Sequence, residues 1–128
     1  MKLASVLLVE DSEPIRTAFT ILLEETGYRV HSAEDGHEAV RTATEHAPDL
    51  VLLDMGLPGM DGLDVVRALK SQPTTADIPV IALTGRDDAG SRRACMEAGC
   101  AEYILKPINT HALLRTIERH LRTAPEKG

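Results

Sequence analysis

Aromatic side chains are scarce in this sequence, which holds one Phe, two Tyr and no Trp among its 128 residues. The interior of the folded chain must therefore be aliphatic, built from Leu, Val, Ile and Ala. Long hydrophobic runs are missing too, since the apolar runs reach only four to six residues. A membrane-spanning helix needs about 20, so we expect no membrane segment, and no signal peptide is visible before the first apolar run.

An excess of positive charge is also lacking. The chain has 14 Lys and Arg against 20 Asp and Glu, which gives a formal net charge of −6. Domains that bind nucleic acid present a basic face that neutralises phosphates. We therefore expect no direct contact with nucleic acid.

Cysteine is limited to Cys95 and Cys100. Two cysteines so close in sequence do not make a disulfide framework, and they cannot supply a four-ligand zinc site. We expect them to be buried or half-buried thiols in a reducing compartment, and hence expect a cytoplasmic protein.

What the sequence does contain is a regular alternation within the length of one domain. Five apolar runs, at residues 6–9, 28–31, 50–53, 78–83 and 103–105, predict strands buried on both faces. Amphipathic segments between and after them predict five helices. The first begins behind Ser12 and ends at Gly27, the second ends before Pro48, and the others lie at about 62–73, 88–98 and 109–121. Strands alternating with helices predict an α/β fold, a doubly wound five-stranded parallel sheet with helices on both faces.

Polar residues follow these strands where each strand ends. Glu10 and Asp11 follow the first run, Asp54 the third, Thr84 the fourth and Lys106 the fifth. The carboxyl ends of parallel strands share one edge of a sheet, where ligands of such sheets bind. We therefore expect these five side chains to converge.

The chemistry of this set is that of phosphoryl transfer. Clustered carboxylates repel one another unless a cation neutralises them, and oxygen ligands without His or Cys favour Mg²⁺, or Mn²⁺ in its place. Lys106 supplies a positive charge for an anionic oxygen and Thr84 a hydroxyl donor. A carboxylate in this setting can act as nucleophile and form an aspartyl-phosphate, so we predict that Asp54 is a phosphoryl acceptor.

The chain resembles the receiver domain of two-component response regulators over about residues 4–122. The resemblance rests on six motifs in register, namely Val9-Glu10-Asp11, Asp54, the loop 57–62, Leu83-Thr84-Gly85, Tyr103 and Lys106-Pro107. It implies the flavodoxin-like strand order 2-1-3-4-5, a receiver domain over residues 1–122, and a polar tail or linker stub at 123–128.

The resemblance also implies roles for single residues. Asp54 would be phosphorylated, and Mg²⁺ would be held by Glu10, Asp11, Asp54 and the backbone carbonyl of Gly56. Thr84 and Lys106 would stabilise the phosphoryl group, Tyr103 would change rotamer on activation, and the Lys106–Pro107 peptide bond would be cis. Gly56 and Arg86 would border the path of the hydrolytic water and so tune dephosphorylation.

Partners are implied in the same way. The donor would be a sensor histidine kinase or a histidine phosphotransfer protein. The output would pass to a downstream protein or a second copy of the chain, through the face made by the fourth helix, fifth strand and fifth helix. Arginines on that face could be solvated or form the docking surface; they are Arg92, Arg93, Arg115, Arg119 and Arg122.

Three other functions compete with this interpretation. A phosphohydrolase of the haloacid dehalogenase type would need an Asp two residues after its nucleophile, where this chain has Gly56, so we do not expect an enzyme that turns over external phosphoesters. A flavin- or nucleotide-binding module would want a glycine- or hydroxyl-rich loop after the first strand, where this chain has Glu10, Asp11 and Glu13. A receiver that acts as an unphosphorylated interaction domain is the third.

Overall fold

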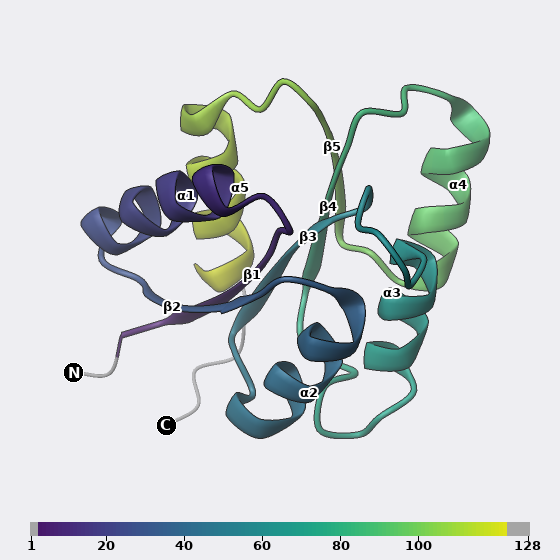
Figure 1. Cartoon of the computed structure of the whole chain (residues 1–128), viewed down its shortest axis with the longest axis horizontal. Helices are drawn as coiled ribbons and strands as arrows, with labels where there is room; N and C mark the ends of the chain where they lie inside the picture. Colours follow the sequence, from purple (N-terminus) through teal and green to yellow (C-terminus); the bar gives the residue numbers. More distant parts are fainter. Residues whose placement is uncertain (1–2, 123–128) are drawn as a thin grey trace.

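The computed structural model describes residues 3–122, in which strands and helices alternate from β1 to α5 (Figure 1). The strands are β1 (Ser5–Val9), β2 (Arg29–Ala33), β3 (Leu50–Asp54), β4 (Val80–Thr84) and β5 (Glu102–Leu105). The helices are α1 (Glu13–Thr26), α2 (Gly36–His46), α3 (Gly62–Lys70), α4 (Ala89–Ala98) and α5 (Thr110–Arg122). The predicted tail 123–128 and the side chain of Arg122 lie outside the described residues. Within 3–122, none of the helices has the length and apolar character to cross a membrane.

The five strands form one parallel sheet in the order β2-β1-β3-β4-β5. This confirms the predicted fold class and strand order. Helices α1 and α5 cover one face, and α2, α3 and α4 cover the other (Figure 1). Crossovers between parallel strands are right-handed, so a helix changes face when the chain changes direction across the sheet. The chain moves one way from β1 to β2 and the other way from β2 to β5, which places α1 on one face and α2, α3 and α4 on the other.

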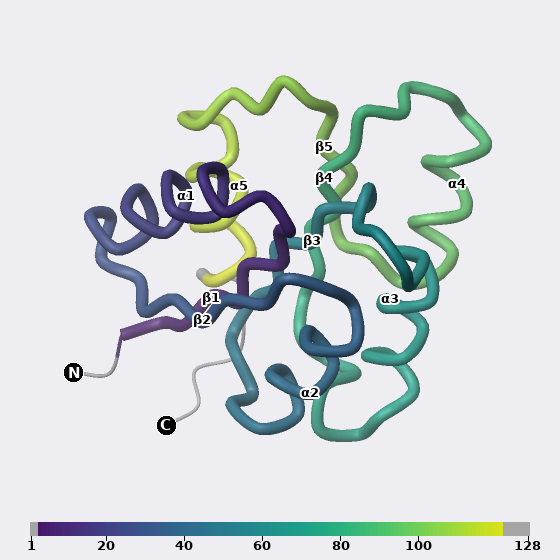
Figure 2. The backbone as a smooth tube through the Cα atoms, viewed as in Figure 1, coloured from purple at the N-terminus to yellow at the C-terminus, as the bar shows by residue number. Residues whose placement is uncertain are grey.

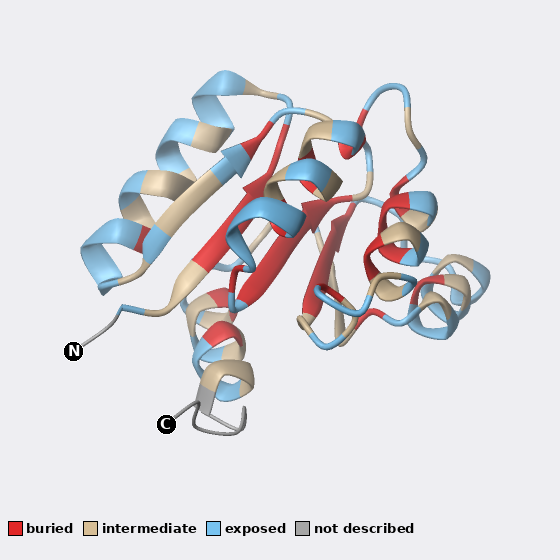
Figure 3. Ribbon diagram, turned by 90° about the horizontal axis from the view of Figure 1, so that it is seen from below, coloured by how far each residue is buried: buried red, intermediate tan, exposed pale blue. Residues whose placement is uncertain are grey.

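Two aliphatic cores follow from the apolar strands. Successive residues of a strand point to opposite faces of the sheet. In β1, Leu7 and Val9 therefore pack towards α2, α3 and α4, while Val6 and Leu8 pack towards α1 and α5. Figure 3 shows β1, β3 and β4 almost wholly buried, with the exposed surface concentrated on the helices.

The helices begin and end at residues that can cap them, which are short polar residues at the N-termini and glycines at C-termini. The hydroxyl of Ser12 caps α1, and the carboxylates of Asp35, Asp61 and Asp88 accept backbone N–H groups at the starts of α2, α3 and α4. Gly27 ends α1 in the left-handed conformation, with φ of 108°. The predicted start behind Ser12 and the predicted stop at Gly27 are confirmed. The third helix ends at Lys70, short of the predicted limit at about 73.

Two strand predictions were wrong in their limits. The fourth strand begins at Val80 rather than Ile78, because the Ile78 N–H donates to the Thr75 carbonyl in a turn. The second strand is shifted towards the C-terminus and ends at Ala33 instead of His31. Neither shift moves a residue of the predicted site.

Because all strands are parallel, their carboxyl ends share one edge. Figure 2 shows the connections that follow β4 and β5 rising from this edge of the sheet. The residues that follow β1 and β3 lie at the same edge, since these two strands are direct neighbours.

Candidate functional site

An acidic cluster lies at the ends of the two central strands β1 and β3. Val9 and Leu53 are register partners, so the residues that follow them are brought side by side. Carboxylate oxygens of Glu10, Asp11 and Asp54 all lie within 4.8 Å of one another. Glu10 and Asp54 are buried, with 5% and 4% of their surface exposed, whereas Asp11 faces solvent.

Burial and mutual repulsion make this cluster electrostatically costly. Burial raises the pKa of Glu10, and the negative charge of Asp54 raises it further. The Ser12 N–H, which donates to Glu10 Oε1 at 3.1 Å, acts in the opposite direction. Three converging oxygen ligands with one open side fit a hard divalent cation such as Mg²⁺, which would relieve this repulsion.

Lys106 brings a positive charge to the same carboxylate. It follows β5, and its Nζ donates to Asp54 Oδ1 at 3.0 Å. The Gly56 N–H donates to the same oxygen at 2.9 Å. The Lys106 N–H donates to the Thr84 carbonyl at 2.7 Å, and the Lys106–Pro107 peptide bond is cis. Asp54 is thus held in orientation by the Gly56 N–H of its own loop and by Lys106, the residue that follows β5.

Thr84 is connected to Tyr103 through one residue. The buried Thr84 hydroxyl accepts the Arg86 N–H at 3.0 Å, and the Arg86 carbonyl accepts the Tyr103 hydroxyl at 2.7 Å. The Arg92 guanidinium lies 5.5 Å from the centre of the Tyr103 ring. We call this series Thr84–Arg86–Tyr103 the switch chain.

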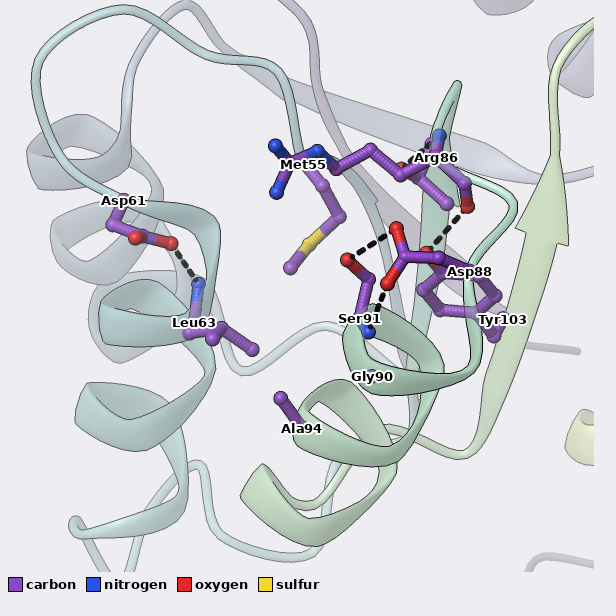
Figure 4. A pocket seen from close by; sticks show the side chains of 10 residues that line it. Met55, Asp61, Leu63, Arg86, Asp88, Gly90, Ser91, Ala94 and Tyr103 are labelled. Carbon is purple, nitrogen blue, oxygen red and sulfur yellow. Dashed lines mark hydrogen bonds between the residues drawn. The ribbon is translucent and has the colours of Figure 1, made fainter.

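A cavity of about 430 Å³ opens beside the switch chain (Figure 4). Its wall is formed by residues at the starts of α3 and α4, including Asp61, Leu63 and Ser91, together with Thr84 and Tyr103. Asp61 and Asp88 are tied to helix starts by their capping hydrogen bonds. Space therefore exists next to Thr84 and Tyr103 into which side chains can move.

The arginines predicted on the output face have different settings. Arg92 packs over Tyr103, and Arg93 and Arg115 are exposed. Arg119 pairs with Glu102 of β5, so part of its charge is neutralised within the face.

Two contributions at the site were missed from the sequence. Arg16 of α1 donates through Nη1 to the Glu10 carbonyl at 2.9 Å, and its Nη2 lies 3.1 Å from Glu34 Oε1. Glu34 lies 18 residues from Arg16 along the chain, so no local sequence pattern predicts that the two side chains pair. Arg86 was assigned only to the water path, whereas its backbone connects Thr84 to Tyr103.

The structure therefore brings most of the predicted residues together. Glu10, Asp11, Asp54 and Lys106 form one cluster, and Thr84 and Tyr103 belong to the switch chain. The backbone N–H of Gly56 donates a hydrogen bond to the Asp54 carboxylate. A role for its carbonyl as a metal ligand stays a prediction.

Comparison with known proteins agrees with this geometry. Residues 6–118 match the family described as the response regulator receiver domain. The chain is 40% identical over 117 residues to the phosphate regulon transcriptional regulatory protein PhoB of Klebsiella pneumoniae, covering 91% of this chain and 51% of PhoB. It thus spans about half the length of that relative.

Two further relatives are matched over nearly their full length. The polar-differentiation response regulator DivK of Brucella anthropi is 39% identical over 120 residues, covering 94% of this chain and 98% of DivK. The crystal structure of a sensor histidine kinase receiver domain from Pseudomonas aeruginosa has a magnesium ion coordinated in the active site cleft. It superposes with a TM-score of 0.87 at 34% identity, covering 95% of this chain and 100% of that domain.

Proposed function

Since the chain belongs to the family of response regulator receiver domains, we propose that it accepts a phosphoryl group on Asp54 from a histidine kinase or a histidine phosphotransfer protein. The observation that carries the proposal is the pairing of the acidic cluster with Lys106 Nζ, 3.0 Å from Asp54 Oδ1. This family consists of signalling domains, and Gly56 stands where a phosphohydrolase would need a second Asp.

The transfer uses groups of this chain in defined roles. A carboxylate oxygen of Asp54 attacks phosphorus as the bond from phosphorus to the donor's imidazole nitrogen breaks. The Lys106 ammonium group and the Thr84 hydroxyl stabilise the negative charge on the phosphoryl oxygens. Glu10, Asp11, Asp54 and the Gly56 carbonyl would hold Mg²⁺ or Mn²⁺, which when bound neutralises charge on the phosphoryl oxygens.

The signal then leaves through the switch chain. The new phosphoryl oxygens accept a hydrogen bond from the Thr84 hydroxyl and draw it away from the Arg86 N–H, and Tyr103 turns into the space that is freed. This shifts the equilibrium between two packings of the face formed by α4, β5 and α5. The free energies of the two packings differ by only a few kcal/mol. A downstream protein or a second copy of the chain reads that face. Residues 1–122 act as the receiver unit.

Incubation with Mg²⁺ and acetyl phosphate, followed by intact mass measurement, tests the acceptor. The wild-type chain should gain one phosphoryl group, and Asp54→Asn should gain none. Asp64→Asn, a matched change of an exposed aspartate on α3, should behave as wild type. Labelling of Asp54→Asn, or of neither protein, would overturn the assignment.

A further inference from the structure

Two thiols meet at the C-terminal end of α4. Gly99 ends the helix with φ of 118°, and its N–H donates to the Met96 carbonyl at 3.1 Å. The Cys100 N–H donates back to the Cys95 carbonyl at 3.2 Å. This is the hydrogen-bond pattern of a Schellman motif, which brings the side chains at its two ends into contact. In this chain both of those side chains are cysteines.

The contact between the sulfur atoms is close. Cys95 Sγ and Cys100 Sγ lie 2.7 Å apart, and both cysteines are free. An S–S bond measures about 2.05 Å, so a side-chain movement of well under about 1 Å would allow the bond to form. Both residues are buried, with 1% and 5% of their surface exposed. Helix ends open locally more readily than helix centres, and a peroxide is small enough to enter when they do.

The contact makes the two thiols unequal in pKa. The hydrogen bond between the two sulfur atoms lowers the pKa of the Cys95 thiol, and the same bond together with burial raises the pKa of Cys100. The positive charge of Lys70 acts against the rise at Cys100. Lys70 lies alongside this turn and is anchored to the carbonyls of Ala76 and Ile78. A thiolate is the nucleophilic form of cysteine, so the geometry supplies both an attacking sulfur and its resolving partner.

We propose that Cys95 and Cys100 form a redox-active pair, which small peroxides convert reversibly into an intramolecular disulfide across the Schellman motif. The first thiolate attacks a peroxide oxygen, the O–O bond breaks, and a sulfenic acid forms. The second thiol attacks that sulfur and releases the oxygen as water. In sum, two thiols and hydrogen peroxide give one disulfide and two water molecules, and a dithiol reductant reverses the change.

The bond would link α4 to the residue that leads into β5. Cys95 lies in the last turn of α4, and Ala101 pairs with β4 directly after Cys100. Oxidation would therefore restrain the face formed by α4, β5 and α5 at one end. This property goes beyond phosphoryl transfer to Asp54, and its chemistry is tested without phosphorylation.

Mass spectrometry of the full wild-type chain tests the pair. The chain is treated with hydrogen peroxide, unfolded without reductant, alkylated with iodoacetamide and digested with trypsin. Both cysteines fall in the peptide 94–115, because Pro107 blocks cleavage after Lys106. This peptide should be lighter by two hydrogen atoms than the reduced peptide and should carry no alkyl group. Dithiothreitol should restore alkylation of both cysteines.

One side product has to be distinguished from the disulfide, and two other outcomes would overturn the proposal. Oxidation of the exposed Met96 adds one oxygen to the same peptide and is separated by mass. Two alkylated cysteines after peroxide treatment would show that the pair does not react. Disulfide-linked dimers in place of the internal bond would show that the thiols are not resolved within one chain.

Gly99→Ala tests whether the conformation of the turn at Gly99 holds the two thiols close enough to react. A Cβ at Gly99 is strained at its positive φ and would lie 3.0 Å from Lys70 Cγ. Disulfide formation should become several-fold slower than in wild type. Gly90→Ala, at the other end of the same helix, should leave the rate unchanged. Equal rates in Gly99→Ala and wild type would exclude the role given to the Schellman motif.

Discussion

At the residue scale, Lys106 and Asp54 are an ion pair with unequal environments. The Asp54 side chain is 5% exposed and the Lys106 side chain 40% exposed. Solvent screens a pair that is open on one side, so its contribution to stability is small. Its contribution to chemistry is larger, because Lys106 directs a positive charge at the oxygen of a buried carboxylate. We therefore expect Lys106 to matter more for phosphoryl transfer than for folding.

Lys106→Met should slow phosphorylation by acetyl phosphate on the order of 100-fold, the usual cost of removing one group that stabilises developing charge. The melting temperature should change by only a few degrees. Intact mass against time gives the rate, and Arg41→Met on α2 is the control for loss of an exposed cation. A wild-type rate in Lys106→Met would contradict the role of Lys106.

Protonation of His31 should lower the free energy of unfolding at acid pH. The ring of His31 on β2 stacks on His46, with centroids 4.3 Å apart. Burial lowers the pKa of His31 below 6.5, and the charges of His46 and Arg29 lower it further. The unfolded chain therefore binds the proton more tightly, so stability is lost as pH falls from about 6.5 through the folded pKa. His31→Gln should lose less stability than wild type between pH 7 and pH 5.

Urea unfolding at several pH values measures this difference. His111→Gln, which alters an exposed histidine on α5, should keep the wild-type pH dependence. An unchanged slope in His31→Gln would mean that another group causes the acid sensitivity.

At the element scale, the contact between α2 and α3 depends on a glycine. Gly36 is the first residue of α2, and it is buried. A Cβ added there would lie 2.7 Å from Val65 Cγ2 and 2.9 Å from Met60 Cβ. These atoms belong to α3 and to the loop before it, which carries the predicted motif 57–62. The close approach of α2 to this loop is therefore possible only without a side chain.

Gly36→Ala should lower the free energy of unfolding by about 1–3 kcal/mol, because the added methyl group overpacks the contact. Urea unfolding followed by circular dichroism measures the change. Gly90→Ala is the matched control, since its Cβ would meet only Asp88 Oδ1 at 3.5 Å. That variant should lose nothing or gain up to about 1 kcal/mol. Equal stability of the two variants would contradict the overpacking.

At the scale of the whole molecule, the switch chain joins the acidic edge of the sheet to the α4 surface. Thr84 ends β4, Arg86 lies in the following loop, and Tyr103 comes from β5. Arg92 of α4 completes the connection by packing over the Tyr103 ring. A change at Asp54 can therefore reach α4 through few and identifiable contacts.

Tyr103→Ala should leave phosphorylation of Asp54 intact and abolish the conformational response of α4 and β5. Asp54 should still be labelled by acetyl phosphate, because Tyr103 is not among the groups that hold its carboxylate. Hydrogen exchange in α4 and β5 should no longer change on phosphorylation. Met96→Ala, an exposed change on α4, should respond as wild type does. A wild-type exchange response in Tyr103→Ala would exclude this route.

Much of this protein was determined by the sequence alone. The runs 6–9 and 50–53 are apolar at every position, which requires cover on both faces of a sheet. Ser12 and Gly27 mark the ends of α1 by capping chemistry that needs no tertiary partner. Acidic and basic residues directly after apolar strands were enough to predict that Glu10, Asp11, Asp54 and Lys106 meet.

Only the tertiary structure decided the contacts between residues far apart along the chain. Arg16 bridges the Glu10 carbonyl to the Glu34 carboxylate, and the Arg86 backbone links Thr84 to Tyr103. The physical reason is that periodicity and capping are local, repeating along one strand or helix. Distances between side chains depend instead on how several elements pack, and a difference of about one ångström between them separates a hydrogen bond from no bond.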